Sequence, residues 1–569
     1  MMNSLLILAT LVHWAVDPMS ETPYLPDAIP ADGRQGGDVQ IIAAKGEYEP
    51  GSFVLRSDCD LGKVELEIED LRTRDGKVFP RGKLDLKTVK VWYQSGNAWF
   101  TYFADKGTKL CPELLLNDED LIRVDTATRS NFARLTEKDG RVHEFWLNNP
   151  QAFQDRAEDV GHGRLGDTFR SMRENFRDAP KHVGATLPKD ISKQFFLTAN
   201  VTKDTPAGLY RGEVKIKSKA KGKGEQWKIP VVLRVLDFEL PRPMCYFDVN
   251  KPFLNWFCDY TSLSAIRMQN GDDLALARRQ LEAICRDFAA HGQYLPSFRG
   301  AIDEPEIVKA AGQDYTADVY AGNMKLDNLC EMRVDARKQR RLADARFGKG
   351  SEPLMSWGDE YGLPLLKAIR PMVRVYHENG IRFAVNSRAT YTAGIELADL
   401  FWPPGWPDRS NAEYTAKFNE ATAGEGYFGW YAGQHVGVEN PAFCRRQYGF
   451  GPYRAGFSCN YNYAHHLDEW NDGVADFYRP MAFVYGCGDG CLDTIAWEGF
   501  REGQDDIRYA TLLKRLALPL AEGKDVDARA AARKALKLLA DADRDDMDLT
   551  TLRREMIVRI LGLLAIAKK

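Results

Sequence analysis

The chain has 569 residues, of which 44% are hydrophobic and 11% are aromatic. This composition is that of a folded protein and excludes a disordered chain, and the length predicts about two to four domains. The 77 basic and 81 acidic residues give a net charge of −4, which indicates neither a nucleic acid nor a membrane surface as partner.

The first recognisable stretch is an apolar run at residues 5–16, LLILATLVHWAV. It is too short to cross a bilayer. It resembles the core of a signal peptide, although no Lys or Arg precedes it and no A-x-A cleavage site follows it. We therefore predict a secreted or periplasmic protein, with residues 1–23 as the signal segment. A wrongly assigned start or a first β-strand is the alternative.

Residues 24–243 alternate between apolar and polar side chains in short stretches, for example GEYEPGSFVLRS, KVELEIEDL and KTVKVWYQ. Segments 209–217 and 227–236 predict a hairpin, because both alternate and a Lys- and Gly-rich loop separates them. Short strands at this spacing predict a β-sandwich domain. The charged, Gly-rich segment 155–184 inside it predicts a long surface excursion, with a lid as the alternative.

The pattern changes after the stiff linker LPRP at residues 240–243. Residues 273–290 predict an amphipathic helix that stops near Gly292. Residues 351–385 then predict strand, loop, helix and strand: a short apolar run ends at Gly358, and a helical pattern follows Pro364.

Further strands are predicted at 427–434, 455–463 and 492–497, the last leading into a long helix. Alternating strands and helices over residues 244–520 predict a (β/α)8-like TIM barrel, irregular because the clear strands number fewer than eight. Residues 521–569 predict a C-terminal helical tail. The predicted fold is therefore multi-domain, β followed by α/β.

Two adjacent carboxylates, Asp359 and Glu360, follow the predicted strand at 354–357. In α/β barrels the carboxyl ends of the strands carry the chemistry, and two acids can divide the roles of acid and base. The alternative is that they complement the dipole of the following helix. Asp303 and Glu304, in AIDEPEI, form a rival pair, although no clear helix-then-strand unit follows them.

The ten cysteines are scattered, and the closest two are Cys487 and Cys491 in CGDGC. No CxxC pair with a set of histidines appears, so we predict neither a zinc site nor another metal or cofactor. Buried thiols are expected, and one disulfide stays open.

Three stretches carry a resemblance to a known family. VTKDTPAGLYRGEVKIK with IPVVLRVLDFELPRP resembles the end of a β-sandwich that precedes a glycosidase barrel, and SWGDEYG resembles the acidic pair of that barrel. DGCLDTIAWEGFREGQDDIRYATLL resembles its closing strand and helix. Together they resemble glycoside hydrolase family 123, β-N-acetylgalactosaminidases, from about residue 40 to 520. The 155–184 excursion and the segment 295–353 depart from the family pattern.

The resemblance implies roles for the acidic pair. In that family the 2-acetamido group of the substrate acts as the nucleophile, an exception to the two-carboxylate scheme. Glu360 would protonate the leaving oxygen and later activate water. Asp359 would hold the acetamido N–H and stabilise the cyclised cation. Neighbouring residues can serve one sugar only where the chain bends, and Gly358 permits a bend.

The resemblance also implies that aromatic side chains wall the acetamido pocket and that a Tyr hydroxyl binds its carbonyl. Packing in the barrel core is the alternative for each of them. Arg501 could bind a ligand or form a structural ion pair. The predicted substrate-binding residues are Asn386, Trp430, Tyr431, Tyr461, Tyr463 and Trp497.

These observations predict retaining hydrolysis of a terminal β-linked N-acetylhexosamine, with N-acetylgalactosamine as first choice. The partner would be a glycan or glycoconjugate, with no nucleic acid and no membrane span. One alternative is a glycosidase of the same fold that acts on a sugar without an acetamido group. The other is a carbohydrate-binding protein without catalysis.

Overall fold

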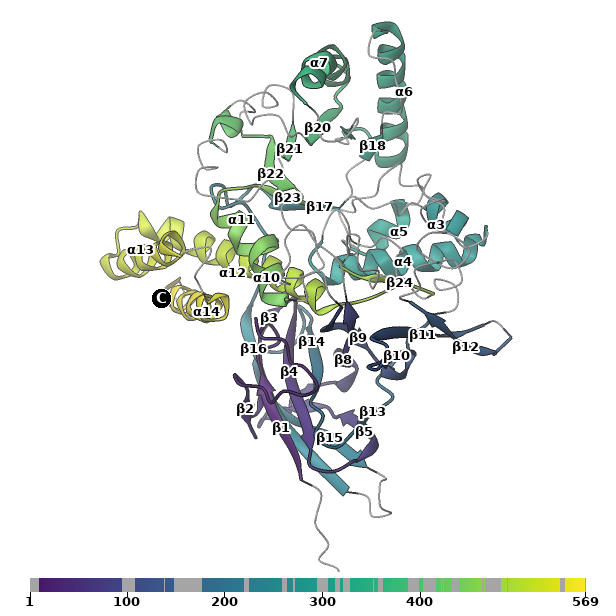
Figure 1. The fold of residues 1–569 in the computed structure, drawn as a ribbon. Helices are drawn as coiled ribbons and strands as arrows, with labels where there is room; N and C mark the ends of the chain where they lie inside the picture. The colour runs from purple at the N-terminus through teal and green to yellow at the C-terminus, as the bar shows by residue number, and fades with distance from the viewer. Residues whose placement is uncertain are drawn as a thin grey trace, which may run out of the picture.

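The computed structural model of the chain is shown in Figure 1. It describes residues 10–94, 108–137, 139–147, 176–218, 225–257, 263–269, 272–293, 305–312, 318–320, 328–350, 353–356, 362–386, 399–402, 416–420, 422, 424–431, 440–462, 465, 483–488, 490–542 and 548–567.

The N-terminal half contains two large β-sheets. The six-stranded sheet has the order β2-β1-β4-β14-β8-β9, and the path of the other is β13-β5-β15-β16-β3, with β6 and β7 attached to it. The first comprises β1 (Leu11–Val16), β2 (Arg34–Gln35), β4 (Glu47–Ser57), β8 (Leu84–Gln94), β9 (Lys109–Leu116) and β14 (Lys193–Val201). The second comprises β3 (Val39–Lys45), β5 (Gly62–Ile68), β6 (Leu71–Arg72), β7 (Val78–Phe79), β13 (Ala185–Leu187), β15 (Gly208–Ser218) and β16 (Glu225–Glu239).

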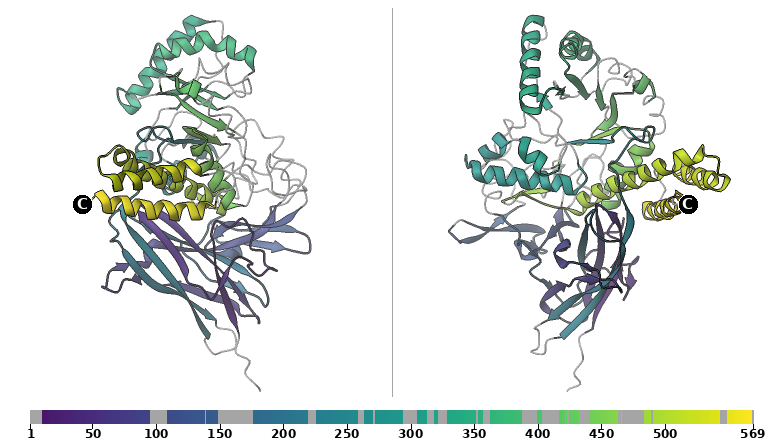
Figure 2. Two further views of the ribbon diagram at one scale, coloured as in Figure 1. Left: turned by 90° about the vertical axis from the view of Figure 1, so that its left-hand side faces the viewer. Right: turned by 180° about the vertical axis from the view of Figure 1, so that it is seen from behind.

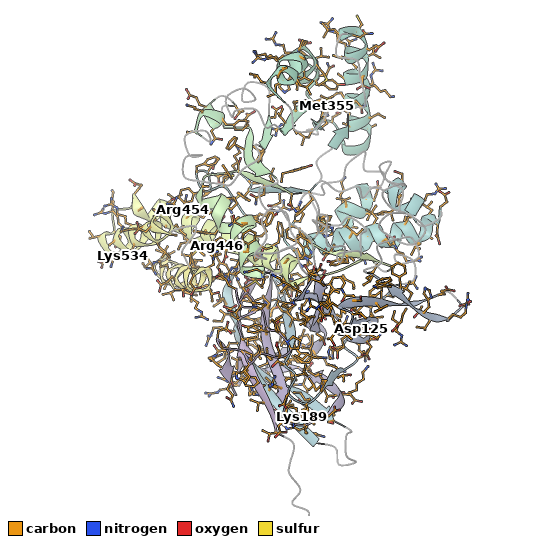
Figure 3. All side chains as sticks on the ribbon, in the orientation of Figure 1. Asp125, Lys189, Met355, Arg446, Arg454 and Lys534 are labelled. Atoms are coloured by element: carbon orange, nitrogen blue, oxygen red, sulfur yellow. The ribbon has the colours of Figure 1, made fainter. Side chains whose placement is uncertain are left out.

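The two sheets pack face to face as a sandwich, and side chains fill the space between them (Figure 3). Phe53 and Phe195, from β4 and β14, stack at 5.2 Å between ring centroids. They belong to one buried cluster with Val214 of β15 and Val231 of β16. The alternation of these strands explains the arrangement, because every second side chain points into the shared core.

The predicted hairpin is present. β15 and β16 pair antiparallel over their length, with Val214 opposite Ile229. The loop between them, at 219–224, lies outside the described residues. β16 ends at Glu239 and the next strand begins at Leu254, so no strand runs through residues 240–247. The domain boundary predicted there stays a prediction, which limited proteolysis would test.

The apolar N-terminal run forms a strand in its second part. Leu11–Val16 is β1, which pairs with β4 and places Trp14 opposite Val54. Trp14 and Val16 are buried in a small cluster with Val54. For these residues the structure agrees with the alternative of a first strand, and export stays a prediction.

Residues 155–175 of the predicted surface excursion lie outside the described residues, and residues 176–184 are described. Its described end is anchored: Phe176 is fully buried, and the Asp178 carboxylate accepts hydrogen bonds from the backbone N–H groups of Asn117 and Asp118. A small three-stranded sheet precedes it, formed by β10 (Ile122–Asp125), β11 (Ser130–Thr136) and β12 (Val142–Trp146).

A curved parallel sheet dominates the second half of the chain. Its seven strands have the order β17-β23-β22-β21-β20-β19-β18. They are β17 (Leu254–Phe257), β18 (Asp318–Tyr320), β19 (Leu354–Ser356), β20 (Arg382–Asn386), β21 (Leu400–Trp402), β22 (Tyr427–Tyr431) and β23 (Cys459–Asn462). The first and the last of these strands in the chain are neighbours. Within the described residues no strand joins β17 to β18, so a closed TIM barrel is not seen.

Helices surround this sheet and complete the chain (Figure 2). Those between the strands are α3 (Leu263–Gln269), α4 (Leu274–Ala290), α5 (Pro305–Ala310), α6 (Leu329–Phe347), α7 (Leu363–His377), α10 (Pro441–Arg445), the π-helix η4 (Arg446–Phe450) and α11 (Gly451–Arg454). Those at the C-terminus are α12 (Ile495–Ala521), α13 (Val526–Asp541) and α14 (Leu549–Ala567). No helix in the described part of the chain is long and apolar enough to span a membrane.

Some sequence expectations need correction. A helix, α5, and then a strand, β18, do follow the 303–304 pair. The sequence did not reveal them because their apolar patterns are too short to recognise. The strand expected at 492–497 ends at Leu492 as β25 (Gly490–Leu492), which pairs antiparallel with β24 (Tyr485–Cys487). The helix begins immediately after it because Thr494 caps its N-terminus by accepting from the N–H of Trp497. None of the nine cysteines in the described residues is in a disulfide.

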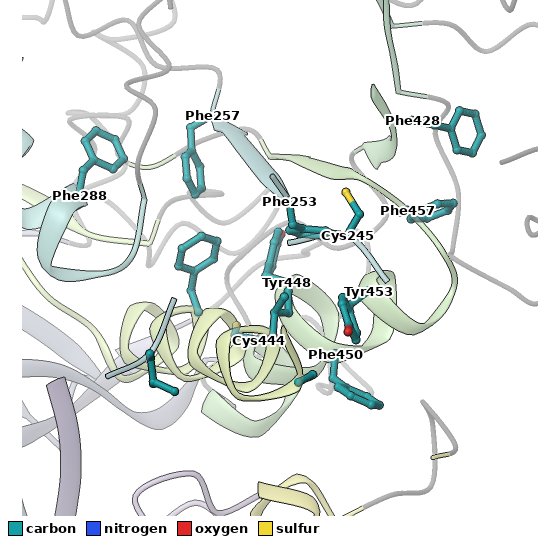
Figure 4. Packing of buried hydrophobic residues seen from close by; sticks show 14 of the residues in the cluster. Cys245, Phe253, Phe257, Phe288, Phe428, Cys444, Tyr448, Phe450, Tyr453 and Phe457 are labelled. Atoms are coloured by element: carbon teal, nitrogen blue, oxygen red, sulfur yellow. The ribbon is translucent and has the colours of Figure 1, made fainter. Parts of the chain in front are cut away.

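Helix α12 contacts both halves, through Tyr509 to Glu47 and through Gln504 to Tyr448. Figure 4 shows part of the buried cluster to which its apolar side chains belong. Two glycines, Gly499 and Gly503, permit the close packing of α10 and η4. A Cβ on Gly499 would lie 2.2 Å from the carbonyl oxygen of Pro441, and one on Gly503 would lie 2.6 Å from that of Arg445. This explains the glycines of the EGFREG stretch as helix-packing residues.

Candidate active site

The carboxyl ends of the seven parallel strands form one edge of the curved sheet. Their register is continuous: Asn386 pairs with Trp402, Tyr431 with Tyr461, and Asn462 with Phe257. Residues that end neighbouring parallel strands therefore meet at this edge, which is where α/β proteins bind ligands.

The acidic pair Asp359–Glu360 lies outside the described residues, but both flanking elements are described. β19 ends at Ser356, and Gly362 is the N-cap of α7. β19 is an internal strand, between β18 and β20.

The flanking helix bears on the alternative role of the pair. The first turn of α7 contains no acidic residue, and its N-cap makes no side-chain hydrogen bond. Asp359 and Glu360 precede this N-cap by three and two residues, and the stabilising effect of a helix dipole is confined to about the first turn. Both the catalytic role of the pair and the alternative that it complements the helix dipole stay predictions.

The rival pair, Asp303 and Glu304, also lies outside the described residues. It directly precedes α5, which is only six residues long. The next strand, β18, follows α5 and lies at the end of the sheet beside β19. The strand–helix–strand argument therefore no longer separates the two pairs, and mutagenesis must do so.

The aromatic candidates divide between two faces of the sheet. In parallel strands paired residues share a face, and the face alternates along the strand. The positions of Tyr431 and Tyr461 share one face, whereas the position of Trp430 pairs with Asn460 on the other. Tyr461 is half-buried. Tyr463 lies outside the described residues.

The second face is a packed polar layer. The Asn460 amide nitrogen donates to Asn255 Oδ1 at 3.1 Å and to the carbonyl oxygen of Tyr448 at 3.0 Å. The Tyr448 hydroxyl donates to Asn462 Oδ1 at 2.8 Å. Gln504 of α12 donates to the same Tyr448 carbonyl at 2.6 Å. This layer ties β17 and β23 to α12, so it positions the strand ends.

The side chain of Trp497 is fully buried, which agrees with the core-packing alternative and leaves it no surface for a sugar. Its ring stacks on Phe500 at 4.6 Å and on His291 at 4.6 Å, and its Nε1 donates to Asp287 Oδ2 at 2.9 Å. Arg501 forms a buried ion pair with Glu498, which agrees with the structural alternative for this residue.

Asp287 is the centre of a polar cluster that sequence reasoning missed. His291 Nδ1 lies 3.0 Å from its Oδ1, and His465 Nε2 lies 3.1 Å from its Oδ2. Burial opposes its ionisation, but the two histidines hold the pKa of Asp287 well below its usual range. Burial likewise opposes the charge on His291, but Asp287 and Glu498 outweigh it and raise the pKa of His291 to about 10.

A polar cavity of about 950 Å³ lies between this cluster and the sandwich. Asp287, His291, Asp493 and Glu498 line one side of it. Tyr48, Lys87 and Asn200 are among the residues that line the sandwich side. The sequence pattern does not predict this cluster, because His465 and Asp287 lie 178 residues apart and meet only in the folded chain.

No protein-family model matches the chain, and no curated protein matches its sequence. Among solved structures, it superposes on a family 123 glycoside hydrolase from Clostridium perfringens, described in a study of glycolipid glycan hydrolysis. The match has a TM-score of 0.61 and 10% identity, and it covers 98% of this chain and 99% of that one. Two β-glucuronidases, from Parabacteroides merdae and Bacteroides uniformis, also align, with TM-scores of only 0.26 and 0.27. The first match shows that the fold is shared.

Proposed function

We propose that the protein is a glycoside hydrolase that removes a terminal β-linked N-acetylhexosamine, with N-acetylgalactosamine as first choice. The observation that carries this proposal is that β19, the strand directly before Asp359 and Glu360 in the sequence, is an internal strand of the parallel sheet. Similarity to a family 123 hydrolase over 98% of the chain supports the same reading.

The proposed mechanism retains configuration and uses the substrate's acetamido oxygen as nucleophile. Glu360 donates a proton to the leaving oxygen while the acetamido oxygen attacks C1, giving an oxazolinium-type intermediate. Asp359 accepts a hydrogen bond from the acetamido N–H and stabilises the positive charge that develops. Glu360 then takes a proton from the water that opens the ring, as microscopic reversibility requires.

A panel of aryl glycosides tests the substrate class. Purified protein should release the aryl group from β-N-acetylgalactosaminide, and more slowly or not at all from β-galactoside and β-glucuronide. A stable thiazoline analogue of the cyclised intermediate should inhibit, because the site binds that state tightly. Turnover of sugars without an acetamido group, together with no thiazoline inhibition, would contradict the mechanism and leave a different glycosidase.

Matched variants test the acidic pair. Glu360→Gln should lose most activity, whereas Asp303→Asn and Glu304→Gln should keep most of it. The reverse pattern would transfer the catalytic role to the earlier pair. Carbohydrate binding by the wild type without turnover of any substrate would identify a binding protein instead.

A further inference from the structure

Three elements that are far apart in the chain bring metal-ligating atoms together beside the cavity. Asp287 comes from α4, His465 from the segment after β23, and Cys491 from β25. One ligand atom from each lies within 4.8 Å of the others. His465 Nε2 is 3.1 Å from Asp287 Oδ2.

We propose that Asp287, His465 and Cys491 bind a divalent transition-metal ion, of which zinc fits best. A zinc ion takes Cys, His and carboxylate ligands at about 2.0–2.3 Å, so its ligand atoms lie roughly 3–4 Å apart. The mixed sulfur, nitrogen and oxygen set disfavours Mg²⁺ and Ca²⁺, which prefer oxygen ligands alone.

The surroundings of these three residues resemble the outer shell of a metal site. Trp497 Nε1 donates to Asp287 Oδ2 at 2.9 Å, which fixes the carboxylate. The Phe288 ring lies 4.2 Å from the His465 ring and holds its plane. His465 is fully buried. Hydrogen bonds and packing that orient ligands in this way tune metal affinity.

A second triad, Asp287, His291 and Asp493, is also compact enough for a metal. However, Asp493 and His291 already make other polar contacts. Lys87 Nζ lies 3.3 Å from Asp493 Oδ2 and would repel a cation there. His291 Nδ1 already lies 2.9 Å from the carbonyl oxygen of Asp287. These two residues therefore belong to the outer shell, on the side of the cavity.

Binding changes the protons of the ligands in a defined way. The thiol of Cys491 loses its proton to solvent and binds as thiolate. The proton between His465 Nε2 and Asp287 Oδ2 must leave Nε2, which then binds the ion through its lone pair while the ring keeps a proton on Nδ1. Asp287 binds as carboxylate. No oxidation or reduction is involved.

The test is metal binding by the full-length protein, with activity not used as the readout. Chelator-treated wild type should bind one Co²⁺ per chain and develop a thiolate-to-cobalt charge-transfer band, which Zn²⁺ then abolishes. Cys491→Ser should lose this band and weaken Zn²⁺ binding by more than about 100-fold.

Cys487→Ser is the matched control, since Cys487 is a buried cysteine of the same hairpin and belongs to neither triad. It should keep the band and the stoichiometry. The proposal is overturned if wild type binds neither ion, if the cobalt spectrum lacks a thiolate band, or if Cys487→Ser loses it as completely as Cys491→Ser. Circular dichroism confirms that each variant is folded. These outcomes do not depend on glycosidase activity, so they are separate from the proposed function.

Discussion

Carboxylates occupy two contrasting regions of this molecule. Those of α12 are buried at the junction of the sandwich, the parallel sheet and the C-terminal helices, and cations face them. Those of the 359–360 pair lie between the end of a strand and the first turn of a helix. The first environment favours stability, whereas the second pair is the candidate for catalysis.

The junction shows what commits a carboxylate to structure. Asp506 is fully buried, and its two oxygens accept bidentate bonds from Arg445 at 2.7 and 2.9 Å. Arg553 of α14 donates to the same carboxylate at 2.7 Å and also pairs with Glu49 of β4 at 3.0 Å. These pairs link the C-terminal helix to both α12 and the sandwich.

The stretch between β19 and α7 differs from the junction. There the acids follow an internal strand, and no acidic residue occupies the first turn of the helix that comes next. The comparison teaches that the number of acids in a stretch says little about their role. The acids of EGQDD are structural, whereas the isolated Asp–Glu pair is the candidate for catalysis.

The largest expected effect separates the two members of that pair. Glu360→Ala should slow natural glycosides by about 10²–10⁴-fold and activated aryl glycosides far less, because a leaving group of low pKa needs little protonation. Asp359→Asn should slow both kinds comparably, since it acts on the nucleophile. The measurement is kcat/KM for both variants on both substrates. Equal sensitivity to the leaving group in the two variants would refute these roles.

Next in size is the effect of Asp506→Asn on stability. Removing the charge leaves two buried guanidinium groups without their shared anion, which typically costs about 3–5 kcal/mol. The midpoint of chemical denaturation should fall, while kcat at a permissive temperature stays unchanged. Asp541→Asn is the control: its pair with Lys537 is 59% and 73% exposed, so its loss should cost at most about 1 kcal/mol. Equal shifts of the two midpoints would show that the buried pairs of the junction stabilise the fold no more than an exposed pair does.

The sequence predicted the strands of the β-sandwich better than those of the parallel sheet, for a physical reason. β15 and β16 are long and alternate, so their pairing and register follow from the pattern. The strands of the parallel sheet are three to five residues long and covered on both sides, so alternation does not reveal them. The position of β17 beside β23 depends on contacts between distant segments.

The residues of the candidate site also differ in how far the sequence could predict them. Asp359 and Glu360 could be predicted as a catalytic pair because a strand and a helix flank them closely in the sequence, and they stay a prediction. Trp497 was assigned to substrate because a pattern cannot distinguish a buried ring from a pocket wall. Asp287, His465 and Cys491 were missed because they come together only in the folded chain.

A smaller effect concerns the pH dependence of the junction. Burial, followed by repulsion from Asp505, raises the pKa of Glu47 to about 8. Because this pKa lies above the ordinary value of about 4.3, the folded state favours the protonated carboxyl. Its contribution to stability is complete below about pH 4 and is lost as the pH rises through 8. Glu47→Gln should therefore flatten the fall in melting temperature between about pH 5 and 8. Parallel curves for the two proteins would contradict this.

The smallest effect tests the two faces of the sheet. If the Tyr461 hydroxyl binds the acetamido carbonyl, Tyr461→Phe should lower kcat/KM for N-acetyl substrates by about tenfold, since one hydrogen bond contributes about 1–1.5 kcal/mol. Trp430→Phe should change it less, because its position pairs with Asn460, whose side chain is bonded to Asn255 and Tyr448. The control ligand is the matching glycoside without the acetamido group, which should inhibit Tyr461→Phe and the wild type competitively with the same Ki. A larger loss from Trp430→Phe, specific to N-acetyl substrates, would place the acetamido pocket on the other face of the sheet.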